Sequence, residues 1–236
     1  MPCAGAGRVL YKIDMAGTTA LEADLPRVTP PVPLPLAYRV IRPPVRAVLE
    51  RFFEFRVDGA EHLPVRGPFI VAANHHNYLD GIVLAVAVPA PIAFLVMPRV
   101  WSATPLHPLF HRHIGSIPLS LSRPDVGALR RALHVLAGGR PVGIFPEGPF
   151  SVRGCLEPGL PGVGLLALRS GVPVVPAAIH GTYAALVGRR AYLPRRHPLS
   201  VRFGPARRFA SHQTSGRAAR GETTQRIMDD IAALLC

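Results

Sequence analysis

The sequence predicts an α/β fold with a mostly parallel, mixed central sheet, flanking helices and an amphipathic helical segment on its N-terminal side. From residue 55 onward, short apolar segments alternate with helix-like segments, which is the pattern of strands joined by crossover helices. Several apolar segments, such as PFIVAA at 68–73, have no charged residue, as is typical of strands buried on both faces. A chain of 236 residues is long enough to bury the core of such a domain.

Residues 1–35 are expected to form an irregular lead. Near its end, prolines alternate with apolar residues, which suits an extended segment better than a packed element. These prolines are Pro30, Pro31, Pro33 and Pro35.

Residues 36–54 are expected to form an amphipathic helix, because apolar residues recur there at spacings of three and four. The residues concerned are Val45, Val48, Leu49, Phe52 and Phe53. Two interpretations are open. The helix either docks on its own domain or lies in a membrane interface, with its apolar face in lipid and its arginines on the head groups.

Residues 55–236 are expected to form the α/β domain. Strands are predicted at 55–57, 68–73, 92–97, 116–121, 141–145, 173–179 and 199–203. Helices are predicted at 80–88, 103–112, 125–137, 160–170 and 223–235. The helix at 125–137 is a clear example, since an apolar stripe runs along it and two glycines follow its end.

The chain is strongly basic, with 27 Lys and Arg against 14 Asp and Glu and a formal net charge of +13. Such a field favours an anionic partner, which can be nucleic acid, an acidic membrane surface or a phosphorylated substrate. The arginines are dispersed, Trp101 is the single Trp, and no recognised nucleic-acid motif occurs. We therefore expect no nucleic acid as partner, and an anionic membrane surface and a phosphorylated substrate both stay open at this point.

No metal site is expected either. The three cysteines are widely spaced, which fits neither a disulfide framework nor a zinc pattern and indicates a reducing compartment. His107, His111 and His113 lie close together, but no nearby Asp, Glu or Cys completes a metal site. We expect these histidines to form a surface or interface patch.

The segment Asn74-His75-His76-Asn77-Tyr78-Leu79-Asp80 directly follows the predicted strand at 68–73, so it lies where α/β folds place their sites. A histidine can act as a general base near neutral pH, and a carboxylate can orient its ring. On one continuous helix, His75 and Asp80 would point about 140° apart. They can pair only if the chain turns between them, with Asp80 near a helix start.

Two other segments follow or contain predicted strands. Phe145-Pro146-Glu147-Gly148 comes directly after the strand at 141–145, and its acidic residue is expected to be a rigid, exposed carboxylate that can bind a substrate hydroxyl. The segment Val172–Pro176 carries two prolines in an apolar strand, which indicates an edge strand or an irregular strand beside a pocket.

In this order and spacing, the three segments resemble the glycerolipid acyltransferase family, which includes bacterial 1-acyl-sn-glycerol-3-phosphate acyltransferases. The family motif N-H-x-x-x-x-D corresponds to Asn74–Asp80, F-P-E-G to Phe145–Gly148, and V-P-x-x-P to Val172–Pro176. The resemblance implies transfer of a fatty acyl group from acyl-CoA or acyl-carrier protein to the hydroxyl of a lysophospholipid, with 1-acylglycerol-3-phosphate among the candidates. Such a reaction belongs to phospholipid synthesis or remodelling.

The resemblance also implies roles for individual residues. His75 would remove the proton of the acceptor hydroxyl and Asp80 would orient its ring, whereas the rival base His76 lacks the family spacing. Substrate contacts are expected from Glu147, Gly148, Arg123 and Pro176. No permanently bound cofactor is expected. The implied location is the cytoplasmic face of a bacterial plasma membrane, as a peripheral or monotopic protein.

The sequence departs from the family where the family binds phosphate. Pro149 and Phe150 replace the usual Thr and Arg, Leu121 replaces another Arg with Arg123 two residues later, and Pro161 replaces a Lys. These departures favour two alternatives: a lipid acceptor that is not of the phosphatidate type, or a non-catalytic membrane-binding relative. A serine hydrolase is disfavoured because no G-x-S-x-G occurs.

Overall fold

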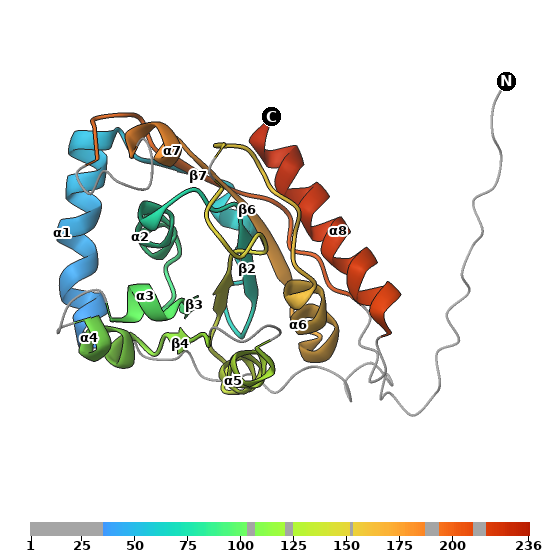
Figure 1. Cartoon of the computed structure of the whole chain (residues 1–236). Coiled ribbons are helices and arrows are strands. Elements are labelled where there is room, and N and C mark those ends of the chain that lie inside the picture. The colour runs from blue at the N-terminus through green and yellow to red at the C-terminus, as the bar shows by residue number, and fades with distance from the viewer. Residues whose placement is uncertain (1–34, 103–106, 121–124, 152, 187–193, 210–215) are drawn as a thin grey trace, which may run out of the picture.

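The computed structural model describes residues 35–102, 107–120, 125–151, 153–186, 194–209 and 216–236. Within these ranges, seven strands form a sheet with the order β1-β7-β6-β2-β5-β3-β4 (Figure 1). The strands are β1 (Arg56–Asp58), β2 (Ile70–Ala73), β3 (Ala93–Val96), β4 (Ile117–Pro118), β5 (Val142–Ile144), β6 (Val174–His180) and β7 (Ser200–Phe203).

The pairing of the strands confirms a mixed, mostly parallel sheet. The five neighbours β6, β2, β5, β3 and β4 all pair in parallel. Strand β7 runs antiparallel to β6, and β1 pairs in parallel with β7. The carboxyl ends of β2, β5 and β6 therefore meet at one edge of the sheet.

Two cores cover the two faces of the sheet. Neighbouring residues of a strand point to opposite faces, so Val71 and Ala73 belong to one core, and Ile70 and Ala72 to the other. The first core contains α1 (Leu36–Phe53) and α2 (Tyr78–Ala87). The second contains α5 (Val126–Ala137), α6 (Gly162–Ser170) and α8 (Arg217–Leu235). In Figure 1, α6 and α8 lie to the right of the sheet and α5 lies below it, whereas α1 and α2 lie to the left.

The predicted helices are present, with shifted boundaries. The expected helix at 103–112 appears as α4 (His107–Ile114), and α8 starts six residues before the expected 223. The short elements η2 (Ala60–His62), α3 (Pro98–Trp101) and α7 (Thr182–Ala185) were not predicted, since three or four residues are too few to show a helical period.

Helix α1 docks on α2 through one face. Tyr38 donates a hydrogen bond to the carbonyl of Ala85 (2.9 Å), and the Arg42 guanidinium donates to the carbonyl of Val86 (2.8 and 3.2 Å). A cation at the last carbonyls of a helix also interacts favourably with the helix dipole. None of the helices within the described ranges is long and apolar enough to cross a membrane.

The predicted apolar stripe of α1 divides between two faces. Leu49 is buried, and Val45 and Phe53 pack against the first core. Val48 and Phe52 point outward and are 50% and 58% exposed. The docked interpretation therefore holds for one side of the helix only.

Strand β6 is not an edge strand, so that part of the prediction is wrong. It lies between β2 and β7, with Pro176 opposite Ala72. The proline is tolerated because the neighbouring chain bulges. Two residues lie between Val174 and Ala177 on β6, whereas three lie between their partners Arg207 and Phe203. Pro176 has no N–H to leave unpaired, and a bulge is one of the few interior positions that suit proline.

Candidate active site

The first two motif segments meet at the carboxyl edge of the sheet. His75 follows β2, and Glu147 follows β5, two strands that pair in parallel. Strand β6 pairs with β2 on its other side and ends beside the same loop. Parallel strands thus bring together segments that lie about 70 to 100 residues apart in the sequence.

His75 and Asp80 form a hydrogen-bonded pair, with 2.9 Å between the His75 Nδ1 and the Asp80 Oδ2. Asp80 reaches the ring because it lies in the first turn of α2. Asn77 is the N-cap of this helix and accepts a hydrogen bond from the Leu79 N–H, while Asp80 accepts one from the Asn77 N–H. This capping box turns the chain between His75 and Asp80, as the sequence required.

Asp80 is fully buried, and its Oδ2 also accepts a hydrogen bond from the His76 N–H (2.5 Å). With Nδ1 of His75 donating to this carboxylate, Nε2 carries the free lone pair. Nε2 makes no hydrogen bond to any of the described residues, so it is available to accept a proton.

Aromatic rings hold the imidazole of His75 in place. Phe145 stacks on it, with 3.8 Å between ring centroids and an interplanar angle of 5°. Phe150 packs its edge against it, with 4.4 Å between centroids. The hydrogen bond to Asp80 and the two phenyl contacts together leave the ring little freedom to rotate.

Two asparagines that sequence reasoning missed fasten this loop to β6 and α7. The Asn74 side chain donates to the carbonyl of Ile179 (3.0 Å) and accepts from its N–H (2.7 Å). The Asn77 side chain donates to the carbonyl of Thr182 (2.7 Å). Both asparagines are buried. The available signal was an asparagine directly after an otherwise apolar strand, because a buried amide must find partners.

Glu147 is not the exposed carboxylate that the sequence predicted. It is only 3% exposed. Its Oε1 accepts a hydrogen bond from the His75 N–H, and its Oε2 accepts one from the Glu157 N–H, both at 2.6 Å. Burial raises the pKa of Glu147 to about 7, although the two backbone donors oppose the increase. Glu147 thus joins the loop after β2 to the loop after β5.

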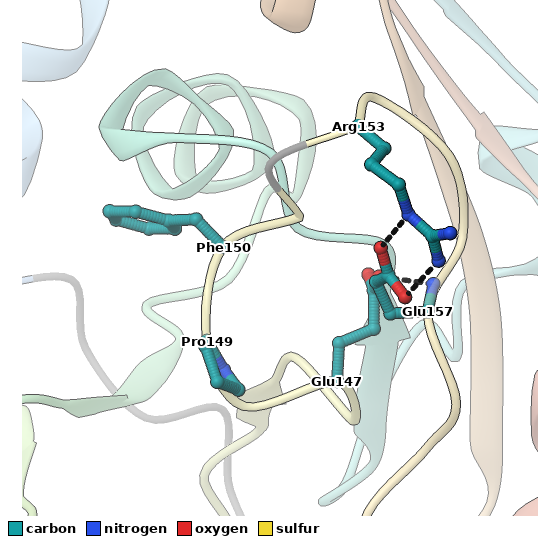
Figure 2. A pocket seen from close by; sticks show the side chains of 5 residues that line it. All are labelled: Glu147, Pro149, Phe150, Arg153 and Glu157. Carbon is teal, nitrogen blue, oxygen red and sulfur yellow. Dashed lines mark hydrogen bonds and ion pairs between the residues drawn. The ribbon is translucent and has the colours of Figure 1, made fainter. Parts of the chain in front are cut away.

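A cavity of about 350 Å³ opens beside this pair of loops, lined by Glu147, Pro149, Phe150, Arg153 and Glu157. In Figure 2 the side chains of Arg153 and Glu157 point toward each other. Phe150 lines the cavity and also packs against the imidazole of His75. The cavity is therefore placed to hold a molecule next to the imidazole.

The other predicted site residues lie apart from this group or outside the described residues. Gly148 adopts a φ of +78° in the turn after Glu147, and a Cβ there would meet Leu160 at 2.7 Å. Pro176 is buried within β6. Arg123 falls in the range 121–124 and outside the described residues.

His76 is partly buried and His111 is fully buried. Burial lowers the pKa of His76, although the nearby Asp80 opposes the effect, and its ring packs edge-on against Tyr183. His111 is buried and stacks on Trp101, with its Nδ1 3.1 Å from the Ser116 hydroxyl. The expectation of a surface patch is therefore wrong for His111. The described residues contain no group of three metal-ligating side chains.

Comparison with known proteins agrees with this architecture. A family model described as "Acyltransferase" matches residues 54–180. A chloroplastic 1-acyl-sn-glycerol-3-phosphate acyltransferase of Brassica napus is 30% identical over 134 residues, which are 56% of this chain and 38% of that protein. The 1-acyl-sn-glycerol-3-phosphate acyltransferase of Bacillus subtilis is 27% identical over 127 residues, 53% of this chain and 62% of that protein.

An uncharacterised Mycobacterium tuberculosis protein is 30% identical over 165 residues, 61% of this chain and 42% of that protein. The match thus spans less than two thirds of each of these relatives. Among solved structures, the 1-acyl-sn-glycerophosphate acyltransferase PlsC of Thermotoga maritima has the same fold, with a TM-score of 0.67 and 24% identity over 85% of this chain and 82% of that one.

Proposed function

Since this chain belongs to the acyltransferase family, we propose that it moves a fatty acyl group from acyl-CoA or acyl-carrier protein to the hydroxyl of a single-chain lipid. The observation that carries the proposal is the His75–Asp80 pair, which leaves the imidazole Nε2 without a hydrogen bond among the described residues. The imidazole packs against Phe150, which lines a cavity. Two acceptor classes fit the reaction. One is a lysophospholipid such as 1-acylglycerol-3-phosphate, which the names of the relatives suggest, and the other is a lipid without a phosphate monoester.

In the proposed reaction, His75 acts as a general base. Nε2 takes the proton of the acceptor hydroxyl while the oxygen attacks the thioester carbonyl carbon, and Asp80 stabilises the imidazolium that forms. The tetrahedral intermediate then collapses, the carbon–sulfur bond breaks, and the imidazolium returns its proton to the thiolate. General base catalysis of this kind supplies about 10²–10⁴-fold in rate. No metal or resident cofactor takes part in these steps.

We propose that Glu147 contributes mainly by holding the backbone of His75. Each of its oxygens already accepts one backbone N–H, and a carboxylate oxygen has a second acceptor position that an acceptor hydroxyl can use. Contacts of Gly148, Arg123 and Pro176 with substrate stay predictions.

The donor is proposed to bind near a second, basic cavity of about 490 Å³, whose polar lining side chains are Glu54, Arg56, His180, His197, Ser200 and Arg202. The register of β1, β7 and β6 places Arg56, Ser200 and His180 side by side. His180 follows Ile179, whose backbone makes two hydrogen bonds with the side chain of Asn74. Asn74 in turn directly precedes His75, so the second cavity lies near the catalytic loop. Phosphate groups of coenzyme A, or the acidic surface of a carrier protein, fit this charge.

The second partner we propose is an anionic membrane surface, bound by the outer face of α1. Leu36, Val40, Val48 and Phe52 recur at spacings of four or eight residues and are 50–67% exposed. Arginines on the same helix, Arg39 and Arg51 among them, are exposed as well. Apolar side chains beside arginines match the acyl and phosphate layers of a membrane. The proposed location is the cytoplasmic face of the membrane, where the lipid acceptor lies.

The test is transfer of a labelled acyl group from acyl-CoA to a panel of single-chain lipids in mixed micelles. We expect turnover by the wild type and a fall of about 10²–10⁴-fold in kcat for His75→Ala. His76→Ala is the matched control, since this neighbouring histidine has no side-chain bond to Asp80, and it should keep most of the activity. Wild-type turnover in the His75→Ala variant would refute the assignment of the base. No transfer by the wild type to any lipid would favour a non-catalytic membrane-binding protein.

A further inference from the structure

The cavity beside His75 has an unusual charge balance for a site that would receive a phosphate. Among its lining residues, Arg153 is the one cation, and Glu147 and Glu157 are acidic. Arg153 forms a bidentate ion pair with Glu157, with Nε 3.1 Å from Oε1 and Nη2 2.8 Å from Oε2. Figure 2 shows both bonds at the wall of the cavity. The guanidinium is thus neutralised where a ligand would meet it.

Glu157 is held in this position by further contacts. The Ser151 hydroxyl donates to its Oε1 (3.3 Å), and its backbone N–H donates to Glu147, which in turn holds His75. The ion pair is therefore part of the network that shapes the site. The Arg153 side chain is 70% exposed, so without this support the pair would reorganise easily around an incoming anion.

The remaining walls of the cavity are apolar. Pro149 and Phe150 line it, and the Phe150 ring packs against His75 and against Tyr78, with 4.4 and 4.8 Å between centroids. Phe150 therefore presents a phenyl ring next to the imidazole and offers no donor to an anion. A polyol that exposes C–H groups and hydroxyls fits such a wall better than an ion does.

We propose that the acceptor carries an uncharged, hydroxyl-bearing head group, and that Glu157 excludes a phosphate monoester by occupying Arg153. The inference rests on the proposed acyl transfer and decides between its two acceptor classes. A phosphate monoester has a charge of about −1.5 to −2 at pH 7 and would lie between two acidic side chains with no unpaired cation among the lining residues. An uncharged diol can donate to the carboxylates and accept from Arg153 without this repulsion.

The decisive experiment compares two acceptors that differ only in phosphate, 1-acylglycerol and 1-acylglycerol-3-phosphate with the same acyl chain. For the wild type with acyl-CoA, we expect kcat/KM to be at least about tenfold higher for 1-acylglycerol. Glu157→Gln leaves Arg153 without a carboxylate partner, so the preference should move toward the phosphorylated acceptor by about tenfold. Adding Arg153→Gln to this variant should remove the shift, because the freed guanidinium is then absent.

Glu50→Gln is the matched control. Glu50 forms the other Arg–Glu pair at a spacing of four, with Arg46 at 2.8 Å on α1, and it does not line the cavity. The ratio of the two kcat/KM values should be unchanged in this variant. A wild type that prefers 1-acylglycerol-3-phosphate, or a Glu157→Gln variant with an unchanged ratio, would overturn the inference.

Binding separates this inference from the proposed reaction. The His75→Ala protein, which lacks the base, is titrated with each acceptor in the absence of donor. Tighter binding of 1-acylglycerol supports the inference even if no acyl transfer is found, in which case the reaction alone is wrong. Tighter binding of the phosphorylated acceptor overturns the inference and leaves the reaction intact.

Discussion

At the scale of single residues, Asp80 serves two structural purposes with one carboxylate. Its Oδ2 fixes the tautomer of His75 and accepts the backbone N–H groups of His76 and Asn77. The first turn of α2 and the orientation of the imidazole therefore depend on the same atom. Its Oδ1 is buried without a hydrogen-bond partner among the described residues, which shows how closely the carboxylate is enclosed.

Asp80→Asn should lower kcat by about 10²–10⁴-fold with a small change in KM, because a neutral amide does not stabilise the imidazolium. Steady-state kinetics with a saturating acceptor measure this. Asp125→Asn is the control: Asp125 also accepts backbone N–H groups at a helix start, those of Ser120 and Ala128, but contacts no histidine. Equal losses in both variants would indicate that helix stability, and not His75, is the cause.

Glu147 makes the stability of the protein depend on pH. Because burial raises its pKa to about 7 from an ordinary value of 4.5, the folded protein keeps a proton in this range that the unfolded chain releases. The contribution of Glu147 to the free energy of unfolding should therefore fall as the pH rises from about 5 to 8, by on the order of 2 kcal/mol. His76, whose pKa burial lowers, contributes in the opposite direction. Urea denaturation at several pH values gives the slope for the wild type.

The comparison is with Glu147→Gln, which does not titrate. This variant loses one backbone acceptor at every pH, so its stability should be lower overall, yet its stability should lack the fall that Glu147 causes between pH 5 and 8. If the variant has the same pH dependence of the free energy of unfolding as the wild type, a group other than Glu147 causes that dependence.

At the scale of elements, α1 has two different apolar faces. One face docks the helix on α2 through Tyr38, Arg42 and Leu49, and the other leaves Val48 and Phe52 in solvent. Docking alone accounts for only one of them. A lipid surface would cover the other.

We expect the double variant Val48→Asp/Phe52→Asp to lose binding to anionic vesicles by at least tenfold, because two charged groups replace the apolar contact. Vesicle flotation measures the bound fraction. The matched control is Val65→Asp, since Val65 is 97% exposed and lies outside the helix. If this control loses as much binding as the double variant, the loss reflects added negative charge and not the face of α1.

At the scale of the whole molecule, the net charge of +13 contrasts with the lining of the proposed acceptor cavity, which has one arginine and two acidic residues. Basic side chains are spread over several elements, among them α1, α5, α8 and the cavity beside β1 and β7. The cavity beside His75, in contrast, is lined by one arginine, which is paired with Glu157. The charge therefore suits attraction of the protein to a membrane and its donor more than selection of the acceptor.

Salt should separate the two contributions to membrane binding. Because the screening length falls from about 10 Å at 0.1 M to about 3 Å at 1 M salt, binding to anionic vesicles should weaken by about tenfold or more over this range. Binding to uncharged vesicles should hardly change, since the apolar face of α1 is not screened. Binding to anionic vesicles that does not depend on salt would show that the net charge does not contribute to membrane binding.

The sequence by itself determined the mixed, mostly parallel sheet and the condition under which His75 can pair with Asp80. Short apolar segments identify strands buried on both faces, and a separation of five residues allows pairing only where the chain turns into a helix. The tertiary structure alone decided that Glu147 is buried, that α1 has two apolar faces and that β6 lies inside the sheet. Local patterns show which residues are apolar or acidic, but burial depends on contacts with distant segments, such as the hydrogen bond from the His75 N–H to Glu147 across 72 residues.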